Sequence, residues 1–164
     1  MSDFELNRWL GMKDSHKSEV FSELTRYIPL PAAAVEKDWW VTQTLRLIFQ
    51  MDCAPFLVFK GGTSLSKAWG LIERFSEDID IALDRSFLGF TGEMTISQVK
   101  KLRKESFSFF SKSFFPEVRS RFREAGLGEA DLRLAEVSGA DQDPLIIEIY
   151  YPAITSSNEY TDTE

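Results

Sequence analysis

Two aspartates separated by one apolar residue, Asp78 and Asp80, are the residues of this sequence best suited to chemistry. Acidic and aliphatic residues alternate over Asp78–Leu83, which predicts a strand with both carboxylates on one face. At a separation of about 6 Å and an effective dielectric of ~20, the two charges repel by roughly 3 kcal/mol, so a cation between them is favoured. Oxygen ligands without histidine or cysteine suit Mg²⁺ or Mn²⁺. The alternative is a strand edge with two solvated aspartates.

A glycine pair, Gly61 and Gly62, precedes this strand by 16 residues. It lies between Phe56–Phe59, an apolar run predicted to be a strand buried on both faces, and a predicted helix over Thr63–Leu71. Glycine lets an anion approach the backbone amides, which predicts a phosphate site at this turn. The adjacent polar residues Lys60, Thr63 and Ser64 support the same interpretation, although Thr63 or Ser64 is also expected to cap the helix. The alternative is an ordinary strand-to-helix turn.

Further helices and strands must position these groups. An amphipathic helix is predicted over Val35–Met51, with a polar stripe of Glu36, Gln43, Arg46 and Gln50. A second amphipathic helix is predicted from Ser97 to about Phe115, ending at Pro116. Strands are predicted over Leu132–Val137 and Leu145–Tyr151. The second of these strands carries Glu148 within an apolar run, where a charge requires a compensating cation.

Length and composition limit the classes of protein to consider. The 164 residues fit one domain, and 43% hydrophobic with 27% charged residues indicate a folded globular chain. One cysteine and one histidine exclude an internal disulfide and a Cys/His zinc site. The apolar runs are far shorter than the roughly 18 residues of a membrane span. The N-terminus mixes acids into the place of a signal peptide, so we expect a cytoplasmic protein without a membrane partner.

Charge is distributed unevenly along the chain. The net charge of −7 argues against indiscriminate binding of nucleic acid by the whole surface. Residues 100–123 nevertheless carry eight basic and two acidic side chains, whereas residues 129–164 carry nine acids and one arginine. The basic segment is either a solvated helix face or a surface that faces a polyanion.

The string FKGGTSLSKAWGLIERFSEDIDIAL, from Phe59 to Leu83, closely resembles the signature of the AbiEii/AbiGii toxin family of the nucleotidyltransferase superfamily. Upstream, EKDWWVTQTLRLI is similar to the family's helix before the first strand. Downstream, IIEIYYP resembles the superfamily strand that supplies a third carboxylate, which would be Glu148. Glu136, in the string LRLAEV, is the alternative candidate for the third carboxylate.

The resemblance implies an α/β (α+β) fold with a mixed sheet flanked by helices. We therefore expect the strands at residues 56–59, 78–83 and 145–151 to lie in one sheet. It also implies transfer of a nucleoside monophosphate from a nucleoside triphosphate (NTP), with Mg²⁺ or Mn²⁺ held by Asp78, Asp80 and Glu148. The expected nucleotide-binding residues are Lys60, Gly61, Gly62, Thr63, Ser64, Arg74 and Ser76.

Members of this family act as toxins of toxin–antitoxin or abortive-infection systems. The expected partners are therefore an NTP, an RNA acceptor (a tRNA for some members) or a protein acceptor, and a protein antitoxin. We expect a helical or irregular segment over residues 1–34, the catalytic core over 35–152 and a polar tail over 153–164. Family members usually continue into a helical C-terminal half, so the tail is expected to be truncated before it. The alternative is a catalytically incomplete module that binds a nucleotide or a protein.

Overall fold

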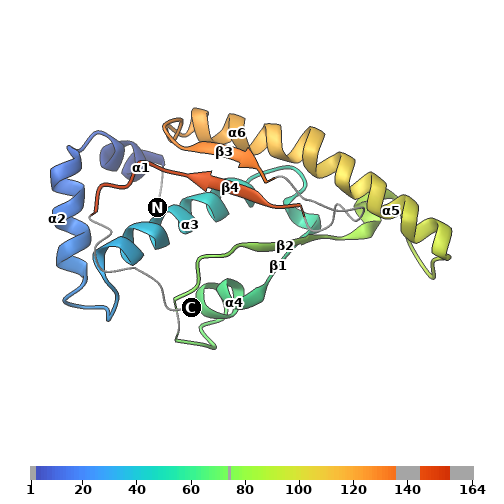
Figure 1. Ribbon diagram of the computed structural model, residues 1–164, viewed down its shortest axis with the longest axis horizontal. Helices are drawn as coiled ribbons and strands as arrows, with labels where there is room; N and C mark the ends of the chain where they lie inside the picture. Colours follow the sequence, from blue (N-terminus) through green and yellow to red (C-terminus); the bar gives the residue numbers. More distant parts are fainter. Residues whose placement is uncertain (1–2, 74, 136–144, 156–164) are drawn as a thin grey trace. The chain divides into compact units, whose positions relative to one another are not determined.

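The computed structural model describes residues 3–73, 75–135 and 145–155 (Figure 1). Its α-helices are α1 (Asp3–Leu10), α2 (Asp14–Leu24), α3 (Ala32–Ile48), α4 (Gly61–Thr63), α5 (Ile96–Phe109) and α6 (Phe115–Glu124). Its strands are β1 (Leu57–Lys60), β2 (Asp80–Leu83), β3 (Asp131–Leu134) and β4 (Ile147–Tyr150). This mixture of helices and strands confirms the α/β class. None of the helices in the described ranges is both long and apolar enough to cross a membrane.

The chain divides into two compact units. The first contains the described parts of residues 1–46, 60–80 and 152–164. Its core includes Leu6, Phe21 and Val41, each at most 6% exposed. The Trp9 ring lies 5.3 Å from the Phe21 ring and 5.8 Å from the Trp39 ring, so aromatic contacts join α1, α2 and α3.

The second unit contains residues 47–59 and the described parts of 81–151. Its buried side chains come from residues 47–57, from the helical segment 110–124 and from the chain at and before β3. They include Met51, Phe114, Val118, Phe122, Leu127 and Leu132, each at most 5% exposed. This core fixes β3 against α6.

The strands pair as two separate two-stranded sheets, β1 with β2 and β3 with β4. The second pair is antiparallel, with Arg133 opposite Glu148. At the end of the first pair, the Asp84 N–H donates to the Phe56 carbonyl. The expectation of one sheet is therefore wrong for the described residues, because β4 takes β3 as its hydrogen-bonding partner. Burial of the first strand on both faces is also wrong, since Val58 is 53% exposed.

Two side chains of the polar stripe predicted for α3 are not exposed to solvent. The helix begins at Ala32, and both Glu36 and Gln43 are buried. Glu36 is 2% exposed because its carboxylate accepts the backbone N–H groups of Ile154 and Thr155, each at 2.9 Å, and the Thr155 hydroxyl. Three donors thus replace the water that this charge would otherwise bind. Thr155, which lies within the expected polar tail over residues 153–164, is 8% exposed.

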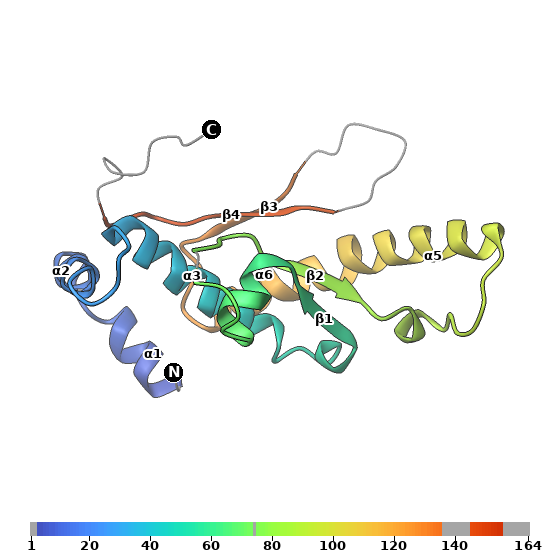
Figure 2. The ribbon, with the colours of Figure 1, turned by 90° about the horizontal axis from the view of Figure 1, so that it is seen from below.

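Pro116 does not end its helix, contrary to the prediction. Helix α5 passes through a π-helical turn, Phe110–Phe114, directly into α6, and Figures 1 and 2 show one continuous helical path. The proline lies in the first turn of α6. A missing N–H is tolerated at such a position, and the π turn provides the wider hydrogen-bonding ring before it.

Candidate functional site

The glycine turn lies directly against the second aspartate of the pair. Helix α4 begins at Gly61, whose φ is +75°, a backbone conformation that favours glycine. A Cβ at Gly61 would lie 2.0 Å from Oδ2 of Asp80 and 2.9 Å from its Cγ. Both the backbone conformation and the approach of this carboxylate therefore require glycine at position 61.

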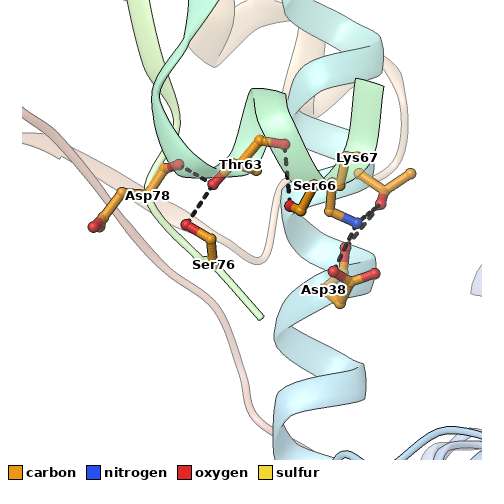
Figure 3. Close-up of polar contacts among 7 residues, drawn as sticks. Asp38, Thr63, Ser66, Lys67, Ser76 and Asp78 are labelled. Carbon is orange, nitrogen blue, oxygen red and sulfur yellow. Dashed lines mark hydrogen bonds and ion pairs between the residues drawn. The ribbon is translucent and has the colours of Figure 1, made fainter. Parts of the chain in front are cut away.

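Thr63 connects the same turn to Asp78. Its side chain is fully buried, and its Oγ1 lies 2.5 Å from the carbonyl oxygen of Asp78 and 2.9 Å from Oγ of Ser76 (Figure 3). The carbonyl can only accept, so the single proton of Thr63 goes to Asp78 and the Ser76 hydroxyl donates in the other bond. These bonds fix the backbone of the aspartate pair to the helix that follows the glycines.

Capping of this helix by Thr63 or Ser64 was predicted and is wrong. The helix begins before both residues, with Lys60 as the N-cap and no side-chain hydrogen bond to the cap. Both Thr63 and Ser64 are buried, at 0% and 4% exposed. Both side chains are therefore buried rather than placed at the helix end to cap it.

Two ion pairs attach α3 to the turn and to the aspartate segment. Lys67 Nζ lies 2.6 Å from the Asp38 carboxylate and 3.2 Å from Oγ1 of Thr42 (Figure 3). Lys37 pairs with Glu77, the residue before Asp78. Asp38 and Lys67 are 29 positions apart, so no local sequence pattern predicts this ion pair.

The other expected nucleotide-binding residues take varied positions. Lys60 is exposed at the end of β1, and no ion pair to it is found in the described parts of the chain. Gly62 lies in the first turn of α4, and Ser76 is partly exposed. Arg74 lies outside the described residues, as does Glu136.

Glu148 lies on the exposed side of β4. It accepts a hydrogen bond from the Tyr150 hydroxyl at 2.9 Å, and this bond, together with the charge of Glu148, raises the pKa of Tyr150. Across the strand pair, the Arg133 guanidinium lies 5.0 Å from the centre of the Tyr150 ring and binds Asp131. The expectation that Glu148 requires a cation because of apolar surroundings is wrong, since alternation along the strand turns its side chain to solvent.

A comparison with models of known protein families identifies the family of this chain. The family model described as nucleotidyl transferase AbiEii toxin, type IV toxin–antitoxin system, matches residues 45–160. This chain belongs to the AbiEii nucleotidyltransferase toxin family. The resemblance found in the sequence is thereby confirmed, and the match includes the glycine turn, the aspartate pair and Glu148. Neither the curated proteins nor the solved structures give a match.

The donor set at the aspartates fits the divalent cation that an AbiEii nucleotidyltransferase implies. Within the described ranges, no three His, Cys, Asp or Glu side chains form a group able to hold a metal. Magnesium, however, is commonly held by one or two carboxylates together with substrate phosphates and water. The exposed carboxylates of Asp78 and Asp80 meet that requirement, and the Asp80 carboxylate lies against Gly61 at the glycine turn.

Proposed function

We propose that this chain binds an NTP with Mg²⁺ at the glycine turn and the aspartate pair, and transfers the nucleoside monophosphate to an acceptor RNA. In this proposal it acts as the toxin of a toxin–antitoxin system, and a protein antitoxin is its partner. One observation carries the proposal. The Asp80 carboxylate lies where a Cβ of Gly61 would be, so one carboxylate of the pair lies directly against the start of the helix.

The residues of this turn have distinct roles in the proposal. Asp78 and Asp80 hold the cation, which neutralises charge on the triphosphate when bound. First-turn amides of a helix lack intrahelical partners, so those after Gly61 are available to phosphate oxygens. Lys60 contributes an exposed ammonium at the same turn. Thr63 and Ser76 are positioning residues, because they hold the Asp78 backbone.

The proposed reaction is a substitution at the α-phosphorus. The hydroxyl oxygen of the acceptor forms a bond to this phosphorus, the bond to the β-phosphate oxygen breaks, and pyrophosphate leaves. Glu148 is proposed to take the proton of the acceptor hydroxyl, as the family resemblance implies. Its exposed carboxylate is accessible to an acceptor.

Transfer of an α-phosphate label tests this function. The protein is incubated with Mg²⁺, bacterial RNA and each of the four NTPs labelled at the α-phosphate, and the label on RNA and on protein is measured. We expect labelled RNA, with at least about a hundredfold loss for Asp78→Asn and for Asp80→Asn, since charge stabilisation at such sites is worth several kcal/mol. Asp52→Asn, an exposed aspartate of the other unit, is the matched control.

The same experiment distinguishes this function from that of a binding module without catalytic activity. An NTP that binds without transfer of label to any acceptor would favour the catalytically incomplete binding module. Transfer that persists in both aspartate variants would contradict the assignment of these residues.

A further inference from the structure

A stripe of five exposed cations runs along the continuous helix formed by α5, the π turn and α6. We call it the basic stripe, and it consists of Lys100, Lys104, Lys112, Arg119 and Arg123. Among the described residues, none of the five has an ion pair. Arg119 lies 5.7 Å from the centre of the Phe115 ring, a contact that leaves its charge uncompensated.

The π turn brings the two ends of the basic stripe onto one face. Lys100 and Arg119 are 19 positions apart, as are Lys104 and Arg123. A π turn contains one residue more than the α-helical turn it replaces. A spacing of 19 residues across it therefore corresponds to about 18 α-helical residues, or five turns of 3.6 residues, which returns the side chain to the same face of the helix. In an uninterrupted α-helix, the arginines would be rotated away from the lysines by about 100°.

The buried side of the helix supports the same phase. Val99 and Val118 are also 19 positions apart, and Val118 is 1% exposed. Val99 is partly exposed, whereas the residues of the basic stripe are exposed, so in both halves of the helix the valine lies on a less exposed side than the cations.

The acids of this helix fall on another face. Glu105 and Glu124 share the spacing of 19 positions, and each follows a residue of the basic stripe by one position, about 100° around the helix. Glu117 pairs with Arg121 at 2.9 Å, and Glu124 accepts from the Ser120 hydroxyl at 2.8 Å. The five cations thus form a local positive surface on a chain with a net charge of −7.

We infer that the basic stripe binds the phosphate backbone of RNA, the acceptor class of the proposed function, on which this inference rests. The stripe is about 35 Å long at 1.5 Å per residue. Phosphate charges recur about every 3.4 Å of axis on each strand of a duplex, so RNA offers several phosphates to a stripe of this length. An acidic protein would need a continuous acidic surface of the same length.

Binding of a fluorescent 20-nucleotide RNA, measured by anisotropy without NTP or Mg²⁺, tests the inference. The variant Lys100→Glu/Lys104→Glu is compared with Arg8→Glu/Lys13→Glu, which makes the same charge change at exposed positions outside this helix. We expect the stripe variant to lose at least about tenfold in affinity at low salt, and the control to stay within about twofold. With about five phosphates neutralised, the slope of log K against log salt should be roughly −3.5 for single-stranded RNA, and shallower in the variant.

Several outcomes would overturn the inference. These are equal affinity of the two double variants, a slope near zero, or poly-glutamate competing as well as RNA at the same charge concentration. Failure of the proposed function gives a different pattern, because RNA binding would then remain while the α-phosphate label is transferred to nothing. Transfer to an acceptor without measurable dependence on the stripe would overturn this inference alone.

Discussion

At the scale of single residues, the sequence identified the glycine pair and the aspartate pair but not how they meet. Residue types and spacing predict a phosphate turn and a carboxylate pair separately. The contact between Gly61 and Asp80 is a tertiary contact between residues 19 positions apart, so no local pattern contains it. Likewise, Thr63 was a predicted phosphate ligand or cap, whereas its buried hydroxyl binds the Asp78 carbonyl.

Gly61 should be the glycine of the pair that tolerates no side chain. Gly61→Ala places a Cβ against the Asp80 carboxylate and demands a positive φ from alanine. We expect a loss of about 1–3 kcal/mol in the free energy of unfolding, measured by denaturant titration. Gly62→Ala, within the first turn of α4, should not lower this free energy, since alanine favours a helix.

The affinity for NTP tests whether the glycine pair binds phosphate. If the amides of the turn hold the triphosphate, a methyl group at Gly62 should weaken NTP binding in calorimetry while the fold stays intact. A well-folded Gly62→Ala variant with unchanged affinity would refute the phosphate role of this turn.

Thr63 should stabilise the site through its hydroxyl. Thr63→Val keeps the size of the side chain but leaves the Asp78 carbonyl without its donor, which should cost about 1–3 kcal/mol of unfolding free energy. The same variant should bind Mg²⁺ with NTP more weakly, because the Asp78 backbone is no longer held. Thr63→Ser retains the hydroxyl and should recover most of both losses. Recovery of stability without recovery of affinity would mean that Thr63 does not position Asp78.

At the scale of elements, periodicity predicted the existence of most helices and strands but not their ends or partners. Apolar residues recur at helical spacing in both α3 and α5, so both helices were found, although part of the polar stripe predicted for α3 is buried. The π turn that carries the helix past Pro116 ends at the buried Phe114, and no local propensity predicts such a turn. Strand pairing depends on residues far apart in the chain, and β4 took β3 as its partner.

The buried Glu36 carboxylate should hold the segment after β4 to α3. Glu36→Gln replaces one accepting oxygen with an NH₂ group, which then faces either the N–H donor of Ile154 or the donors of Thr155. We expect a loss of about 2–3 kcal/mol in unfolding free energy, since bonds to a charged acceptor are strong. Glu19→Gln, an exposed acid on α2, is the matched control. Hydrogen exchange at the Thr155 amide should accelerate in the Glu36 variant, and an unchanged rate would show that the carboxylate does not hold this segment.

At the scale of the whole molecule, the family and the α/β class were predictable because one short signature carries both. The string from Phe59 to Leu83 contains the turn, the helix and the aspartate strand, and the family match confirms its assignment. The role of Glu148 stays a prediction. The sequence predicted buried surroundings for Glu148 because its neighbours form an apolar run. In a two-stranded sheet, however, one side of each strand is exposed to solvent.

Binding of an NTP together with Mg²⁺ should increase the stability of the whole chain. An NTP with Mg²⁺ binds the native state only, so at 100 times its Kd it should add about 2.7 kcal/mol of stability. For a chain of this size, that corresponds to a rise in Tm of about 5–10 °C, measured by differential scanning fluorimetry. Mg²⁺ alone should give a much smaller rise, because two carboxylates complete its coordination only together with phosphate oxygens. Asp78→Asn/Asp80→Asn should abolish the rise with NTP, whereas an equal rise in this variant would exclude both aspartates as ligands.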